Sequence, residues 1–124
     1  MTQPAGAIPG IDVSAAASQL QTSAKADGRP LLLDVREPNE LVVARVEGAA
    51  HYPMSTFAER YIELPKDRPL LVMCATGGRS AAVTAFLQRG GWTDVHNVEG
   101  GITAWQRAGL PVKRGPLEPG EGAI

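Results

Sequence analysis

The chain has 124 residues, 44% of them hydrophobic and 20% charged, and its 12 Lys and Arg nearly balance its 13 Asp and Glu, for a formal net charge of -1. This length suits one domain around a single hydrophobic core and leaves no room for a second catalytic domain. We expect neither nucleic acid nor membrane as a partner, because no basic stripe is present and no apolar run approaches the roughly 20 residues of a membrane span.

The first ten residues, MTQPAGAIPG, predict a flexible start to the chain. They contain no Lys or Arg and no apolar stretch typical of a signal peptide, so we expect a cytoplasmic protein. A helix is predicted over residues 15–26, with Ser14 as its N-cap and apolar residues at helical spacing. The folded domain is expected to cover residues 11–112.

Strands and helices then alternate. Residues 31–35 (LLLDV) predict a strand buried on both faces, because they begin with a continuous apolar run of three leucines, which Asp34 and Val35 follow. Pro38 suits the first turn of a short helix that runs to about Arg45. Residues 49–52 predict a short strand, and residues 55–62 predict a weaker helix.

The second half of the chain repeats this alternation. Residues 70–74 (LLVMC) give the clearest strand, and a helix is predicted from about Arg79 to Arg89. A short strand over residues 95–98 and a last short helix follow. Gly and Pro dominate residues 113–124, which we predict to be a flexible tail.

This order of elements predicts a three-layer α/β domain, with a central, mostly parallel sheet flanked by helices. Ligands of such sheets bind beyond the carboxyl ends of the strands. Asp34 and Arg36 lie at one such end and Cys74 lies at another. We therefore expect these three residues to belong to one ligand-binding site.

Cys74 is the only cysteine, which excludes an intrachain disulfide, a CxxC redox pair and a cysteine zinc site. The segment that follows it predicts an anion-binding loop that leads into a helix, in which Gly77 and Gly78 turn successive main-chain amides toward one point. Arg79 would supply a cation, and Ser80 and Thr76 would supply hydroxyl donors. Such surroundings lower a cysteine pKa below its usual value of about 8.5 and give a nucleophile. The alternative is a small buried apolar residue that ends a strand.

Four segments in order resemble the rhodanese family of sulfurtransferases: LLLDVREPNE, EGAAHYP, PLLVMCATGGRSA and NVEGGITAWQRAGLPV. The resemblance covers residues 11–112 and implies a rhodanese-like α/β fold. It also implies that Cys74 carries sulfane sulfur as a persulfide, held by the amides of the loop from Ala75 to Arg79. The expected partners are a small sulfur donor, either thiosulfate or a persulfide, and a thiophilic acceptor such as cyanide, a thiol or a sulfur-relay protein, without a cofactor. Many members carry a basic residue where this chain has Ala75, which favours a persulfide over dianionic thiosulfate.

Asp34 and Arg36 share one face of their strand, because side chains alternate. One interpretation is structural, with Arg36 paired to Glu40 and Asp34 holding the loop amides; the other is direct contact with substrate. His51 and His96 have no partner at metal-ligand spacing, so no metal is expected.

Two other functions stay open. The domain could be a non-enzymatic persulfide carrier or a docking module for a dedicated partner. It could also be a cysteine phosphatase or an arsenate reductase. Related enzymes of those two kinds place five residues between cysteine and arginine, whereas four lie between Cys74 and Arg79, so a tetrahedral phosphate is not expected to fit.

Overall fold

The computed structural model describes residues 7–22 and 28–124. Its five strands form one sheet in the order β1-β5-β4-β2-β3, and every neighbouring pair is parallel. The strands are β1 Gly10–Ile11, β2 Leu31–Asp34, β3 Ala50–His51, β4 Leu70–Met73 and β5 Val95–Val98. The helices are α1 Val13–Thr22, α2 Pro38–Val43, α3 Met54–Arg60, α4 Gly78–Arg89 and α5 Gly101–Arg107, with a 3-10 turn at Tyr61–Glu63 after α3.

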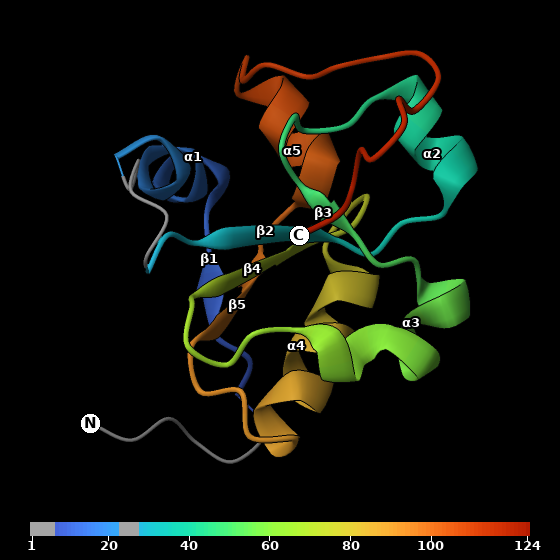
Figure 1. Ribbon diagram of the computed structural model, residues 1–124. Helices are drawn as coiled ribbons and strands as arrows, with labels where there is room; N and C mark the ends of the chain where they lie inside the picture. Colours follow the sequence, from blue (N-terminus) through green and yellow to red (C-terminus); the bar gives the residue numbers. More distant parts are fainter. Residues whose placement is uncertain (1–6, 23–27) are drawn as a thin grey trace.

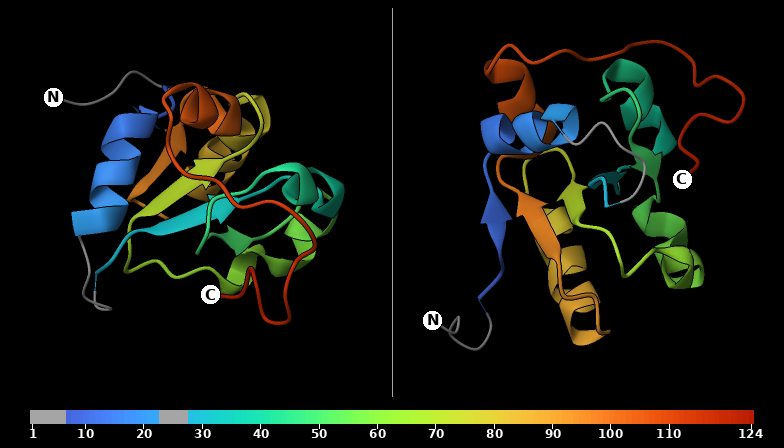
Figure 2. Two further views of the ribbon diagram at one scale, coloured as in Figure 1. Left: turned by 90° about the horizontal axis from the view of Figure 1, so that it is seen from above. Right: turned by 60° about the vertical axis from the view of Figure 1, so that its left-hand side comes forward.

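The helices cover both faces of the sheet. Helices α1 and α5 lie on one face, and α3 and α4 lie on the other (Figure 1). Helices α2 and α3 are at the side of the sheet that ends in β3 (Figure 2). The predicted three-layer α/β domain is therefore confirmed. Within the described ranges, no helix combines the length and the apolar character needed to cross a bilayer.

Alternate residues of the two central strands supply two separate cores. Leu33 of β2 and Val72 of β4 belong to the core on the face of the sheet that α3 and α4 cover. Leu32 and Leu71 belong to the core on the opposite face, which α1 and α5 cover. Burial on both faces explains why both strands are apolar apart from Asp34, the last residue of β2. Cys74 continues the alternation and packs on the α3 and α4 side, which directs its side chain toward the start of α4.

The N-terminal part differs from the prediction in two places. Gly10–Ile11 form strand β1, which pairs with β5 in the register Gly10 with Asn97 and Ile11 with Val98. Two residues carry no alternation, so the sequence pattern does not reveal this strand. Helix α1 begins at Val13, and the carboxylate of Asp12 accepts a hydrogen bond of 2.8 Å from the amide of Ala15. Asp12 therefore caps the helix in place of Ser14.

Two predicted segments lie partly outside the described residues. The flexible start was predicted over residues 1–10, of which residues 1–6 are outside them. The first helix was predicted to reach residue 26, and residues 23–27 are outside them as well.

Residues 113–124, whose composition predicts a flexible tail, contact the rest of the domain. The buried Arg45 forms an ion pair with Glu121 and donates a hydrogen bond of 2.7 Å to the carbonyl of Gly115. The main chains of Arg45 and Lys113 exchange two hydrogen bonds of 2.9 and 2.7 Å. Gly and Pro exclude regular structure in this segment, but they do not prevent an arginine elsewhere in the chain from fixing its carbonyls and a carboxylate.

Candidate active site

The cysteine loop, defined as residues 74–80, runs from the carboxyl end of β4, the central strand, into the first turn of α4. Cys74 is only 1% exposed. Gly77 has φ +110°, a conformation that side chains with a Cβ rarely adopt, and this residue turns the chain into α4. Gly78 lacks a positive φ, and a Cβ there would meet open space. Only the first of the two glycines is therefore required by the backbone.

Hydrogen-bond donors converge on the sulfur of Cys74. The amide of Gly77 lies 3.1 Å from Sγ, and the hydroxyl of the buried Ser80 lies 3.3 Å from it. Burial raises the pKa of the thiol, but hydrogen bonds from the Ser80 hydroxyl and from the amides of Ser80, Gly77 and Thr76 outweigh burial and hold that pKa below its ordinary value. Thr76 contributes its amide, and its side chain is exposed. These hydrogen bonds therefore stabilise the thiolate of Cys74 relative to its thiol.

Arg79 is held by Glu40 of α2 through two hydrogen bonds of 2.8 Å, one to each carboxylate oxygen. This contact lowers the pKa of Glu40 to about 2 and raises the pKa of Arg79. The predicted ion pair of Arg36 with Glu40 is wrong, because the carboxylate of Glu40 binds Arg79 and Arg36 contacts only the carbonyl of Glu40, at 3.5 Å. The guanidinium stands beside the cysteine loop, but it shares its charge with Glu40.

Asp34 and Arg36 form a buried ion pair with each other. The guanidinium of Arg36 lies 2.8 Å from Oδ2 of Asp34, and both side chains are less than 5% exposed. Asp34 also accepts a bond of 3.0 Å from the amide of Arg36, and Arg36 donates one of 2.8 Å to the carbonyl of Ala44. Asp34 thus holds Arg36 and its amide rather than the amides of the cysteine loop. These contacts favour a structural role for both residues.

The start of α5 contacts the main chain of the cysteine loop. The amides of Ile102 and Thr103 donate hydrogen bonds of 2.9 and 3.1 Å to the carbonyls of Cys74 and Ala75. Gly101 has φ +57°, and a Cβ there would lie 2.3 Å from the carbonyl oxygen of Cys74. From the sequence, Gly100 and Gly101 predict only a turn. The structure shows in addition that the main chain at residue 101 lies so close to the carbonyl of Cys74 that only glycine fits there.

Asn97 of β5 is a second residue that the sequence reading did not single out. Its Nδ2 donates to the carbonyl of Gly77 at 3.3 Å, and its Oδ1 accepts from the hydroxyl of Ser80 at 2.5 Å. The only sequence signal for Asn97 is that it is a polar residue within a short predicted strand. Asn97 therefore connects β5 to both Gly77 and Ser80.

We predict different effects for alanine at the two loop glycines. Gly77→Ala should destabilise the protein by more than about 1 kcal/mol, because alanine is strained at this φ, and it should slow alkylation of Cys74 by displacing the Gly77 amide. Gly78→Ala should leave both properties close to those of the unmodified protein. Urea unfolding and the rate of iodoacetamide alkylation measure the two effects. Equal losses in both variants would contradict this account of the loop.

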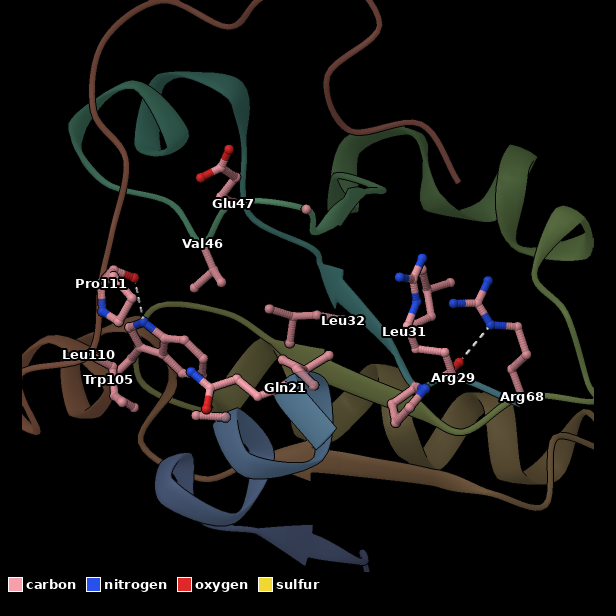
Figure 3. Close-up of a pocket in the computed structure, with 14 residues that line it drawn as sticks. Gln21, Arg29, Leu31, Leu32, Val46, Glu47, Arg68, Trp105, Leu110 and Pro111 are labelled. Carbon is pink, nitrogen blue, oxygen red and sulfur yellow. Dashed lines mark hydrogen bonds between the residues drawn. The ribbon is translucent and has the colours of Figure 1, made fainter. Parts of the chain in front are cut away.

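The chain also has a hollow of about 350 Å³ away from the cysteine (Figure 3). It lies between α1, α5 and the amino end of β2, and its wall includes Trp105, whose Nε1 donates to the carbonyl of Pro111 at 2.9 Å. None of the residues that line it is a Cys, Ser or His. Among the residues described, no group of three or more His, Cys, Asp and Glu is arranged to hold a metal ion. The cysteine loop therefore remains the candidate site.

Comparison with known proteins identifies relatives. The profile of the rhodanese-like domain matches residues 16–108, a range that includes the whole cysteine loop. A sulfurtransferase of Allochromatium vinosum is 40% identical over 82 residues, which make up 66% of this chain and 77% of the relative. The thiosulfate sulfurtransferase GlpE of Vibrio cholerae is 31% identical over 103 residues, which make up 83% of this chain and 92% of the relative. A crystal structure of a rhodanese-related protein from Thermoplasma volcanium matches with a TM-score of 0.75 and 32% identity, covering 85% of this chain and 97% of that one.

Proposed function

The chain belongs to the rhodanese-like domain family, and on this premise we propose that it is a sulfurtransferase in which Cys74 carries sulfane sulfur between a donor and an acceptor. The names of the relatives support sulfur transfer of the rhodanese type in general. One observation carries the specific assignment. Main-chain amides and the hydroxyl of Ser80 converge on the only thiol, at the carboxyl end of the central strand.

In the first step the Cys74 thiolate attacks the outer sulfur of the donor. With thiosulfate, a new bond forms between Sγ and that sulfur, the S–S bond of thiosulfate breaks, and sulfite leaves with the electron pair. The product is a Cys74 persulfide whose negative charge lies on the outer sulfur. With a persulfide donor, the same attack releases the donor's thiolate. The amides of the cysteine loop would stabilise the anionic outer sulfur.

In the second step the acceptor attacks the outer sulfur and the Cys74 thiolate leaves. Cyanide takes the sulfur as thiocyanate, and a thiolate takes it as a new persulfide. A sulfur-relay protein would react through its own thiol in the same way. The chain holds no second thiol, so the loaded form should persist until an acceptor arrives from outside.

We propose a persulfide as the preferred donor. Ala75 adds no positive charge beside the cysteine, and the guanidinium of Arg79 is already shared with Glu40. The site therefore attracts dianionic thiosulfate weakly.

A comparison of two assays on one preparation tests the proposed chemistry. We expect thiocyanate to form from cyanide and a sulfur donor, and we expect no measurable hydrolysis of p-nitrophenyl phosphate. Only four residues lie between Cys74 and Arg79, and a loop this short is not expected to surround a tetrahedral phosphate. A phosphatase also needs a general acid to protonate its leaving group. Phosphatase turnover that disappears when Cys74 is replaced would overturn the assignment. Loading of one sulfur without turnover would favour the carrier role over the enzyme.

A further inference from the structure

Ser80 stands between two groups that compete for one hydrogen atom. Its Oγ lies 3.3 Å from Sγ of Cys74 and 2.5 Å from Oδ1 of Asn97. Ser80 is fully buried, so water does not supply another partner. A hydroxyl carries a single hydrogen and can donate it to only one of the two acceptors at a time.

The orientation of the Asn97 amide is set by its other contact. Its Nδ2 faces the carbonyl oxygen of Gly77 at 3.3 Å. The reversed amide would place an oxygen against that carbonyl and leave neither group with a hydrogen to share. Oδ1 therefore faces Ser80 as an acceptor, and the hydroxyl hydrogen of Ser80 points to Asn97 while the thiol is protonated. The S–H of Cys74 can then donate to Oγ of Ser80.

We propose that Asn97 is a positioning residue that competes with the Cys74 thiolate for the hydroxyl hydrogen of Ser80 and so sets how readily the thiol ionises. The inference rests on the proposed role of Cys74 as the sulfur carrier. When the thiol loses its proton to water, the hydroxyl of Ser80 turns from Asn97 to the anionic Sγ. Once Sγ bonds to a second sulfur, the charge lies on the outer sulfur and the hydroxyl can return to Asn97.

The charged groups around Cys74 are already paired with one another. Arg79 on α4 pairs with Glu40 on α2, and Asp34 pairs with Arg36 beyond β2. On β5, His96 lies 3.5 Å from Asp94, and strand alternation places it on the face opposite Asn97. Asn97 is neutral, so replacing it with an apolar residue changes none of these charges directly.

The test is the pH dependence of Cys74 alkylation in a double-mutant cycle. Asn97→Ala should lower the alkylation midpoint, because Ser80 is then free to donate to the sulfur. Below the midpoint the alkylation rate should rise between about twofold and tenfold, the range for one neutral hydrogen bond. Ser80→Ala should raise the midpoint. Adding Asn97→Ala to Ser80→Ala should change nothing further, because Asn97 acts through the Ser80 hydroxyl.

Two further variants serve as controls for this cycle. Asn97→Leu fills the space of the amide and should lower the midpoint as Asn97→Ala does, which keeps the test decisive if the alanine variant folds poorly. His96→Ala, on the same strand but the opposite face, should leave the midpoint unchanged. A raised midpoint in both Asn97 variants, or an equal shift with and without the Ser80 hydroxyl, would reduce Asn97 to an anchor for Gly77 and overturn the inference. Alkylation needs no sulfur donor, so failure of sulfur transfer and failure of this inference are seen separately.

Discussion

Cys74→Ser should abolish thiocyanate formation and sulfur loading while the protein stays folded. Serine has nearly the shape of cysteine, so the packing of this 1% exposed side chain against the α3 and α4 core should survive. The pKa of a serine hydroxyl is far above that of a thiol, so the same hydrogen bonds leave serine protonated at neutral pH and it offers no nucleophile to the donor. Activity should fall to the rate of the reaction without protein. Thiocyanate production and circular dichroism measure the two outcomes.

The matched control for this variant is Ser80→Ala, which keeps the thiol and removes one hydrogen bond to it. It should retain sulfur loading at high pH, where the thiolate forms without assistance, and lose much of it at lower pH. Residual transfer in Cys74→Ser that exceeds the reaction without protein would contradict covalent catalysis by this residue.

Asp34→Ala should cause the largest loss of stability of any variant discussed, about 3–5 kcal/mol in the free energy of unfolding. The guanidinium of Arg36 is only 4% exposed and would remain buried without its carboxylate partner. Three further donor contacts to Asp34, from the amide and Nε of Arg36, would be lost at the same time. Urea-induced unfolding measures the change.

The double variant Asp34→Ala with Arg36→Met tests the cause of that loss. It removes both charges and keeps an apolar stem in place of the arginine, so it should be more stable than Asp34→Ala alone. Glu118→Ala is the surface control, because its contact with Lys113 is exposed and should contribute little. A double variant as unstable as the single one would show that the ion pair is not the source of the effect.

The sheet and its two cores could be predicted from local patterns. Residues 31–33 and 70–73 are apolar without interruption, and the structure buries both faces of the strands that they form. Strand β1 could not be predicted in this way, because a strand of two residues, Gly10–Ile11, is too short to show an alternation of apolar and polar residues. The predicted N-cap of α1, Ser14, was also wrong. Asp12 and Ser14 are both favourable N-cap residues, and only the position at which the helix begins decides between them.

The contacts that surround the site depend on tertiary structure. The loop motif predicted the converging amides, but nothing local to Arg79 indicates Glu40, which lies 39 residues away. Asn97 lies in strand β5, and its contacts with Ser80 and Gly77 form only when β5 lies beside β4. The C-terminal segment shows the same limit, because Arg45 fixes a stretch that looks unstructured by composition.

The most direct test of the central claim is the intact mass of the protein after incubation with thiosulfate and, separately, with a low-molecular-weight persulfide. We predict a gain of one sulfur atom, located on Cys74 by peptide fragmentation and formed faster from the persulfide. Cyanide should remove this sulfur and release thiocyanate. An unchanged mass with both donors, or the same gain in Cys74→Ser, would contradict the claim that Cys74 carries sulfur in this protein.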